Sequence, residues 1–259
     1  MDLQLNGKTA LVTGSTAGIG LAIAQSLARE GTRVIVNGRT QVRVDAALDK
    51  LPPGASGLAA DLGTAAGAAA AIERYPAVDI LINNLGIFEP KPFEDIPDED
   101  WLRFFEVNVM SGVRLSRHYL PRMKAAGWGR IIFISSESGI QIPTEMIHYG
   151  FTKTAQLAIS RGLAETTAGT GVTVNSVLPG PTNSEGVGAF VSQLAAQGST
   201  TRESVERDFF RSGRPSSLLQ RFATPGEVAA MVTFVASPLS SATNGAALRV
   251  DGGVVRSIV

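Results

Sequence analysis

Short, nearly continuous apolar runs alternate along the chain with longer segments whose apolar residues recur at helical spacing. The runs predict strands at Thr9–Val12, Arg33–Val36, Gly57–Ala60, Asp79–Ile82, Arg130–Ser135, Thr173–Leu178 and Ala247–Val250. The longer segments predict helices at Ile19–Glu30, Gln41–Leu51, Thr64–Arg74, Asp98–Ala126, Tyr149–Thr167 and Pro225–Ala236. Apolar runs without polar alternation are typical of parallel strands that helices cover on both faces.

This alternation of strands and helices predicts an α/β fold. We expect a Rossmann-type, doubly wound parallel sheet of about seven strands with helices on both faces. A chain of 259 residues can bury one sizeable core, and neither a linker nor an internal repeat divides it. We therefore expect a single domain over residues 1–259, with its ligand at the carboxyl ends of the strands.

One segment, residues 181–220, interrupts the alternation. It is polar, rich in Ser, Thr, Gly and Arg, and lies between the sixth predicted strand and the last predicted helix. Long excursions of this kind are usually functional lids or disordered. Short helices are expected within it at Val187–Ala196 and Glu203–Phe210. Its Arg211 and Arg214 are candidates for contact with an anionic substrate, and a solvated helical face is the alternative.

The composition excludes several classes of protein. The chain has 23 basic and 23 acidic residues, a formal net charge of zero, which argues against nucleic acid or an anionic membrane as a partner. It has no cysteine and two histidines, so thiol chemistry is excluded and no metal site is expected. No apolar run approaches the ~20 residues that span a bilayer, and the N-terminus lacks signal-peptide features. A cytoplasmic location is expected.

A glycine-rich turn lies between the first predicted strand and the first predicted helix. It reads Thr13-Gly-Ser-Thr-Ala-Gly-Ile-Gly20. Gly14 permits a tight turn, Gly18 lets the backbone approach a pyrophosphate, and Gly20 lets the helix pack closely on the strand. The N–H groups at the helix N-terminus are then placed to bind phosphates. A loop without a ligand is the alternative, but the flanking strand and helix favour a dinucleotide site.

A second motif brings a hydroxyl, a phenol and an amine within reach of one another. Ser136 follows an apolar run, and Tyr149 and Lys153 are four residues apart, on one face of a helix. A phenol has a pKa of about 10, which a nearby ammonium lowers. These groups supply what carbonyl reduction needs: a proton donor, a tuning cation and an orienting hydroxyl. Tyr-xxx-Lys alone favours a half-buried tyrosine beside a surface lysine, but the glycine-rich turn shifts the interpretation to catalysis.

Together these motifs resemble the short-chain dehydrogenase/reductase family, and within it the 3-oxoacyl-carrier-protein reductases and related ketone reductases. The resemblance runs from Lys8 to Gly253, in the family's order and at its intervals. The matching pieces are Thr13–Gly20, Asp61-Leu62, Asn83–Gly86, Asn108, Ser136, Tyr149, Lys153, Pro179-Gly180 and Val250–Gly253. In this family the segment 181–220 is a lid over the substrate.

The resemblance implies a nicotinamide cofactor, and two residues bear on which one. NAD-preferring enzymes usually carry an acid after the second strand, where it holds the ribose 2′-hydroxyl. Here Gly38 takes the place of the acid and Arg39 follows it; a guanidinium suits a 2′-phosphate. NADP is favoured over NAD, although Ala17 replaces a basic residue that many NADP-dependent members carry. The implied cofactor residues are Gly14, Ser15, Thr16, Gly18, Ile19, Gly20, Arg39, Asp61, Leu62, Asn83, Gly86, Tyr149, Lys153, Pro179, Gly180, Thr182 and Ser184.

By the same resemblance, Asp61 and Leu62 would flank the adenine and Asn83 would lie near the ribose. Asn84 would instead tie the sheet together.

The catalytic residues implied by the resemblance are Asn108, Ser136, Tyr149 and Lys153. Ser136 would bind the carbonyl oxygen of a ketone and Tyr149 would protonate it, while Lys153 lowers the Tyr149 pKa and binds the nicotinamide ribose. Asn108 would interrupt the long helix and, through a water, connect Lys153 to solvent. The expected activity is hydride transfer between NADP(H) and a ketone or secondary alcohol. The alternatives are a non-catalytic dinucleotide-binding regulator of the same fold and an NAD-dependent alcohol dehydrogenase.

Residues near these motifs are candidates for the substrate pocket: Phe88, Ser138, Gln141, Ile142 and Met146. His148 is interpreted as a pocket-wall or surface residue.

Enzymes that resemble this one are commonly tetramers. The helices Met110–Ala126 and Tyr149–Thr167 carry many small or apolar residues, and the tail Gly252–Val259 ends in apolar ones. A homotetramer is therefore expected, with a dimer as the alternative.

Overall fold

A computed structural model describes residues 1–198 and 200–258. Within these residues seven strands form one parallel sheet, in the order β3-β2-β1-β4-β5-β6-β7. The strands are β1 (Thr9–Val12), β2 (Arg33–Gly38), β3 (Ser56–Ala59), β4 (Ile80–Asn83), β5 (Gly129–Ile134), β6 (Val172–Pro179) and β7 (Ala247–Val250). The strand order reverses between β1 and β4, and such a switch point opens a crevice at the carboxyl ends of the strands. The predicted fold class is confirmed.

The connections between the strands are helical. The helices are α1 (Gly18–Arg29), α2 (Gln41–Leu48), α3 (Ala65–Arg74), α4 (Asp98–Phe105), α5 (Ser111–Ala125), α6 (Ile147–Glu165), α7 (Glu185–Gln197), α8 (Arg202–Asp208) and α9 (Pro225–Ala236). The segment predicted as one helix, Asp98–Ala126, is broken by a π-helical turn, Glu106–Met110, that contains Asn108. No helix in the described part of the chain is long and apolar enough to cross a membrane.

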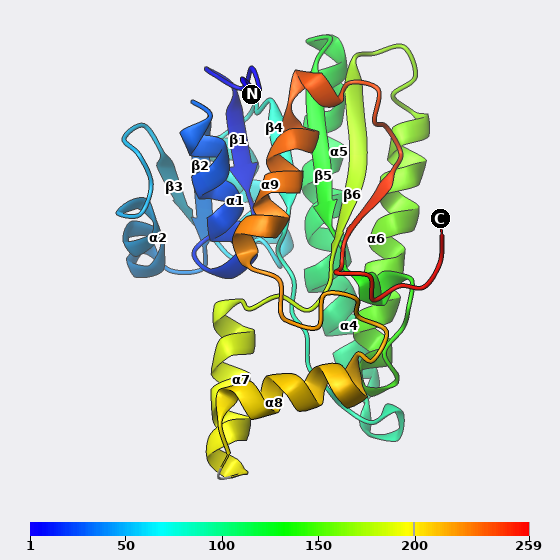
Figure 1. Cartoon of the computed structure of the whole chain (residues 1–259). Coiled ribbons are helices and arrows are strands. Elements are labelled where there is room, and N and C mark those ends of the chain that lie inside the picture. Colours follow the sequence, from blue (N-terminus) through cyan, green and yellow to red (C-terminus); the bar gives the residue numbers. More distant parts are fainter. Residues whose placement is uncertain (199, 259) are drawn as a thin grey trace.

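Helices cover both faces of the sheet, because successive strand side chains point to opposite faces. On β1, Ala10 and Val12 pack in one apolar core with α1, α2 and α9, whereas Leu11 packs in a second core with α3, α5 and α6. This division explains why the strands read as continuous apolar runs. Figure 1 shows α1 and α9 together on one side of the sheet and α5 and α6 on the other.

The long excursion leaves the sheet at its carboxyl edge. It contains α7 and α8, and a π-helical turn at Phe209–Gly213 continues from α8. Figure 1 shows both helices lying beyond the strand ends, apart from the helices that cover the sheet. Residue 199, within the predicted lid, and Val259, at the end of the predicted apolar tail, lie outside the described residues.

Candidate active site

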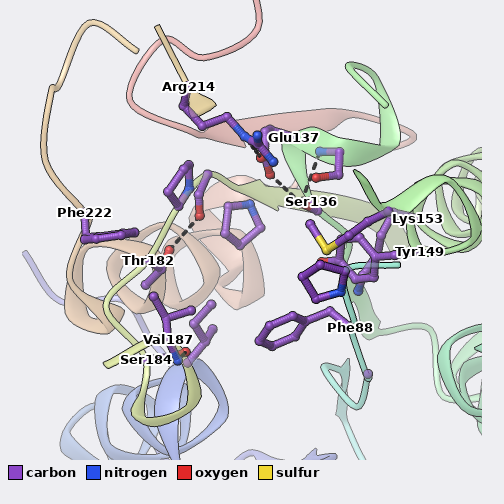
Figure 2. Close-up of a pocket in the computed structure, with 18 of the residues that line it drawn as sticks. Phe88, Ser136, Glu137, Tyr149, Lys153, Thr182, Ser184, Val187, Arg214 and Phe222 are labelled. Atoms are coloured by element: carbon purple, nitrogen blue, oxygen red, sulfur yellow. Dashed lines mark hydrogen bonds and ion pairs between the residues drawn. The ribbon is translucent and has the colours of Figure 1, made fainter. Parts of the chain in front are cut away.

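The residues of the catalytic motif converge where β5 ends. Ser136 lies two residues beyond β5, and its Oγ accepts a hydrogen bond of 3.1 Å from the backbone N–H of Ser138, which caps a short 3-10 turn. Tyr149 and Lys153 come from the first two turns of α6, and the Lys153 Nζ lies 5.6 Å from the centre of the Tyr149 ring. Figure 2 shows the three side chains on one wall of a cavity. The structure therefore brings together the groups that the spacing predicted.

Lys153 is buried and held in place from two sides. Its Nζ donates to the Ile134 carbonyl (2.9 Å), at the end of β5, and to Gln156 Oε1 (3.3 Å). Burial disfavours the ammonium form and lowers the pKa of Lys153 to about 8, although the nearby Glu137 carboxylate raises it. Lys153 is thus a positioned cation with a pKa close to neutral.

Asn108 is positioned by the π-helical turn. Its side-chain amide accepts from the Ile87 N–H (2.7 Å) and donates to the Ile87 carbonyl (2.9 Å), which pins the loop after β4. Its main-chain carbonyl accepts a 2.6 Å hydrogen bond from Gln156 Nε2. Gln156 therefore connects Lys153 to Asn108. The sequence analysis missed Gln156, although its position three residues after Lys153 places it on the same face of α6.

The pKa of Tyr149 is shifted in the direction opposite to the one expected. Burial raises the pKa of Tyr149 above its ordinary value, the Glu137 carboxylate raises it further, and the Ser136 hydrogen bond and Arg214 act in the opposite direction. The predicted lowering of this pKa by Lys153 is not the dominant effect. There are two physical reasons. The Lys153 Nζ donates its hydrogen bonds to Ile134 and Gln156, and burial would deprive a Tyr149 phenolate of its hydration, which disfavours the charged form. The phenol therefore stays protonated at neutral pH.

The glycine-rich turn has the geometry that a phosphate needs. Gly14 and Gly18 adopt positive φ angles of 60° and 55°, and a Cβ on Gly20 would lie 2.5 Å from the Gly14 carbonyl oxygen. The residue at the N-cap of α1, Ala17, provides no side-chain cap. The first N–H groups of α1 therefore lack a side-chain acceptor, as in helix N-termini that bind anions. These residues fit a dinucleotide.

Three of the predicted cofactor residues turn their side chains into the interior of the fold. Ser15 is fully buried, and its hydroxyl donates to the Val12 carbonyl (2.7 Å). Leu62 packs in the apolar core, and the buried Asn83 amide donates to Ser116 Oγ of α5 (3.2 Å). The side chains of these three residues are thus engaged inside the fold, and the places of Leu62 beside the adenine and of Asn83 near the ribose stay predictions.

Asn84 faces the glycine-rich turn instead. Its amide donates to the carbonyls of Thr13 (2.9 Å) and Gly14 (3.1 Å), which joins the end of β4 to the end of β1. It also lines the cavity. Asn84 thus ties the strand ends together, as predicted, and it does so at the edge of the site.

A cavity of about 690 Å³ connects the glycine-rich turn with the catalytic residues. The lining that extends from the turn comprises Ile19, Asn84, Gly86, Pro179, Gly180, Thr182 and Ser184, and the opposite end includes Phe88, Ser138, Met146 and Tyr149. α7, α8 and the π-helical turn after α8 contribute Val187, Val191, Val205, Asp208, Phe209 and Ser212. The excursion 181–220 therefore forms one wall of the cavity.

Two predicted pocket residues are placed elsewhere. Gln141 and Ile142 are exposed and do not line the cavity. Their prediction as pocket residues is wrong, because the chain turns outward between the 3-10 turn Glu137–Gly139 and α6.

His148 is neither a pocket wall nor a surface residue. It is fully buried, and the centre of its ring lies 4.1 Å from the ring centre of Phe104 and 6.1 Å from the ring centre of Trp101, both on α4. Burial lowers its pKa, so the imidazole is neutral at pH 7. The expected placement was wrong because α4 packs against the start of α6 and covers this side chain.

Gly38 and Arg39 stand at the end of β2, beside the glycine-rich turn. A Cβ on Gly38 would lie 2.4 Å from Thr16 Cγ2, so Thr16 occupies the space next to it. Arg39 is exposed, and so is Asp61, beyond the end of the neighbouring strand β3. An exposed guanidinium at this point is available to a ligand that lies along the turn.

Comparison with known proteins places this geometry in context. Residues 8–195 match the family model described as short chain dehydrogenase. Over the full length of both proteins, the chain is 54% identical to YvaG, an uncharacterized oxidoreductase of Bacillus subtilis. It is 36% identical to a D-beta-hydroxybutyrate dehydrogenase of Cupriavidus necator, over 97% of this chain and 99% of that protein. The solved structure of L-sorbose reductase from Gluconobacter frateurii, complexed with NADPH and L-sorbose, superposes over the whole of both chains with a TM-score of 0.93 at 29% identity.

Proposed function

The chain belongs to the short-chain dehydrogenase family, and we propose that it is an NADP(H)-dependent oxidoreductase acting on a ketone or secondary alcohol. The observation that carries this proposal is the convergence of Ser136, Tyr149 and Lys153 at one end of a cavity whose other end reaches the glycine-rich turn. A cavity with this outline accommodates a dinucleotide along the turn and a substrate against the phenol.

The bound nicotinamide would supply or accept a hydride. Ser136 donates a hydrogen bond to the carbonyl oxygen, and Tyr149 gives it a proton as negative charge develops. The raised pKa of Tyr149 keeps the phenol protonated until that moment. Lys153 holds the nicotinamide ribose and stabilises the phenolate that forms, and Gln156 and Asn108 fix its position.

A panel of ketones with NADPH and NADH, followed by nicotinamide absorbance, tests the activity. Turnover of a ketone supports the proposal. Binding of either nucleotide without turnover of any ketone or alcohol would identify a non-catalytic regulator instead.

We also propose NADP(H) as the preferred cofactor, because the exposed Arg39 follows a glycine at the place where NAD-preferring enzymes carry an acid. The L-sorbose reductase structure, which holds NADPH, supports this choice. A triple variant, Thr16→Ser, Gly38→Asp and Arg39→Ile, should reverse the preference and change the NADPH/NADH ratio of kcat/KM by about 10- to 100-fold, the value of one charged hydrogen bond. Thr16→Ser is included because an Asp at position 38 needs the space of the Thr16 methyl group.

Thr16→Ser alone is the control for this variant, and it should leave the preference for NADPH in place. A wild-type protein that prefers NADH would refute the assignment of NADP(H) as the preferred cofactor.

We propose a homotetramer, with α5 and α6 at a subunit contact. Exposed apolar side chains gather near these helices, including Leu102 (68% exposed) and Phe105 on α4 and Phe151 on α6, and soluble monomers rarely leave such patches uncovered. Light scattering coupled to size-exclusion chromatography should give four times the chain mass, or twice for a dimer. A monomer at micromolar concentration would contradict this proposal.

The cytoplasmic location stays a prediction.

A further inference from the structure

Glu137 is a buried acidic residue beside the catalytic serine that the mechanism above does not use. Its side chain is 7% exposed, and it lines the cavity. The Ser136 hydroxyl donates a 2.5 Å hydrogen bond to Glu137 Oε2. The proton with which Ser136 must orient a substrate carbonyl is therefore held by a carboxylate.

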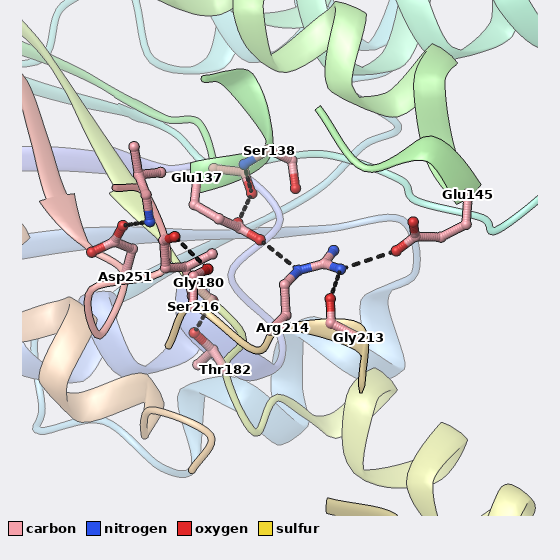
Figure 3. Close-up of polar contacts among 12 residues, drawn as sticks. Glu137, Ser138, Glu145, Gly180, Thr182, Gly213, Arg214, Ser216 and Asp251 are labelled. Carbon is pink, nitrogen blue, oxygen red and sulfur yellow. Dashed lines mark hydrogen bonds and ion pairs between the residues drawn. The ribbon is translucent and has the colours of Figure 1, made fainter. Parts of the chain in front are cut away.

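The lid segment supplies the partner of this carboxylate. Arg214, whose side chain is 11% exposed, lies 3.5 Å from Glu137 Oε1 through its Nε and 3.1 Å from Glu145 Oε1 through its Nη1. The same Nη1 donates to the Gly213 carbonyl (2.8 Å). Figure 3 shows Arg214 reaching from the lid segment to both acids. An anionic substrate would therefore have to compete with two carboxylates for this guanidinium.

The other charged residues of the cavity also disfavour the binding of an anionic substrate. Its charged lining residues are Glu137, Glu145 and Asp208 against Lys153 and Arg214. Asp208 pairs with Arg211 and Arg214 pairs with Glu137 and Glu145, so among these lining residues Lys153, which serves the chemistry, is the one cation without an acidic partner. An anionic substrate therefore finds no free cation at the substrate end of the cavity.

Substrate binding would change the hydrogen bonding of Glu137. When Ser136 turns its proton to a carbonyl oxygen, Glu137 Oε2 loses its donor. An ionised carboxylate only accepts hydrogen bonds, and a buried one left without a donor is costly. A hydroxyl on the carbon next to the carbonyl would lie beside Ser136 Oγ and within reach of Glu137, and it would replace the lost donor.

We propose that Glu137 makes this site selective for uncharged ketones that carry a hydroxyl group on the carbon next to the carbonyl, and for the corresponding vicinal diols. This inference rests on the proposed oxidoreductase function and names its substrate class. Arg214 holds Glu137 toward the substrate, so the lid segment takes part in the selection.

A matched pair of ketones tests the inference: 2-hydroxycyclohexanone and 2-methylcyclohexanone, which differ by a hydroxyl in place of a methyl group. The wild-type protein should have a kcat/KM at least about 100-fold higher for the hydroxyketone, because sites built to bind a hydroxyl strongly reject analogues that lack it. Acetoacetate, an anionic ketone, should be a poorer substrate than the hydroxyketone. In Glu137→Met the ratio for the matched pair should fall to near one, whereas Glu137→Gln, which keeps an acceptor, should retain part of it.

The ratio separates recognition from the effect of Glu137 on Ser136, because any loss of Ser136 positioning affects both ketones alike. Arg214→Gln should lower the ratio. Arg211→Gln is the matched control and should leave it unchanged, since Arg211 is 82% exposed and pairs with Asp208 of its own segment. Nucleotide binding by each variant verifies that it is folded.

Three outcomes would overturn the inference: a wild-type ratio near one, a preference for acetoacetate, or a ratio that survives Glu137→Met. Turnover of the ketones without preference would leave the proposed function standing. Absence of turnover with both ketones and both nucleotides would instead count against the proposed function itself.

Discussion

Tyr149→Phe should lower kcat for ketone reduction by about 10²- to 10⁴-fold, the usual contribution of a positioned proton donor. The variant removes one oxygen from a half-buried ring that packs against Phe88, with ring centres 6.4 Å apart. The Lys153 contacts to Ile134 and Gln156 do not involve that oxygen. Nucleotide binding, measured by fluorescence titration, should therefore remain within a fewfold of wild type while turnover is lost.

Tyr119→Phe is the matched control. The Tyr119 hydroxyl is buried, but it donates to the Tyr75 carbonyl (2.7 Å) between α5 and the end of α3. Its loss should cost about 1 kcal/mol of unfolding free energy and leave kcat unchanged. A Tyr149→Phe protein with near-normal turnover would rule out the phenol as the proton donor.

Lys153→Met should damage both chemistry and nucleotide binding, because the same ammonium stabilises the phenolate and holds the nicotinamide ribose. Loss of a hydrogen-bonded charge costs about 1.5–3 kcal/mol, or roughly 10- to 100-fold in nucleotide affinity, and kcat should fall by at least as much. Stopped-flow binding and steady-state rates measure the two effects separately.

Gln156→Glu is an informative companion, because it places a carboxylate 3.3 Å from the Lys153 Nζ and should raise the Lys153 pKa.

The pH dependence follows from the burial of Lys153. Because burial lowers its pKa to about 8, the ammonium is lost as the pH rises through that value. The kcat/KM for the nucleotide, which reports ionisations of the free protein, should therefore decline above about pH 8. In Lys153→Arg the decline should disappear from this range, since a guanidinium stays charged. A decline that persists in Lys153→Arg would assign it to another group.

Local sequence determined the framework of this protein. The seven apolar runs became the strands within two residues of their predicted ends, because strand formation depends on a pattern that each run carries by itself. Gly14, Gly18 and Gly20 predicted their turn for the same reason: the restriction to glycine acts at single positions. The spacing of Tyr149 and Lys153 likewise sufficed to place both on one face of α6.

Only the tertiary structure decided which way several side chains face. Asn83 and Asn84 are neighbours of one residue type, yet Asn83 turns into the interior toward α5 and Asn84 toward the glycine-rich turn, because side chains alternate along a strand and its end. His148 is buried because α4, more than 40 residues earlier in the chain, packs over it. The pKa of Tyr149 likewise depends on burial by the surrounding elements, which the Tyr-Lys spacing does not report.

The contact between Glu137 and Arg214 shows most clearly what local pattern leaves open. The two residues are 77 positions apart, and they meet only because the excursion after β6 lies across the carboxyl ends of the strands (Figure 1). In the sequence Glu137 reads as one more polar residue after a strand, and Arg214 as a candidate contact for an anionic substrate, whereas the structure pairs it with Glu137 and Glu145. The path of the lid is set by packing between distant elements, so the charges that face the substrate were decided by the tertiary structure alone.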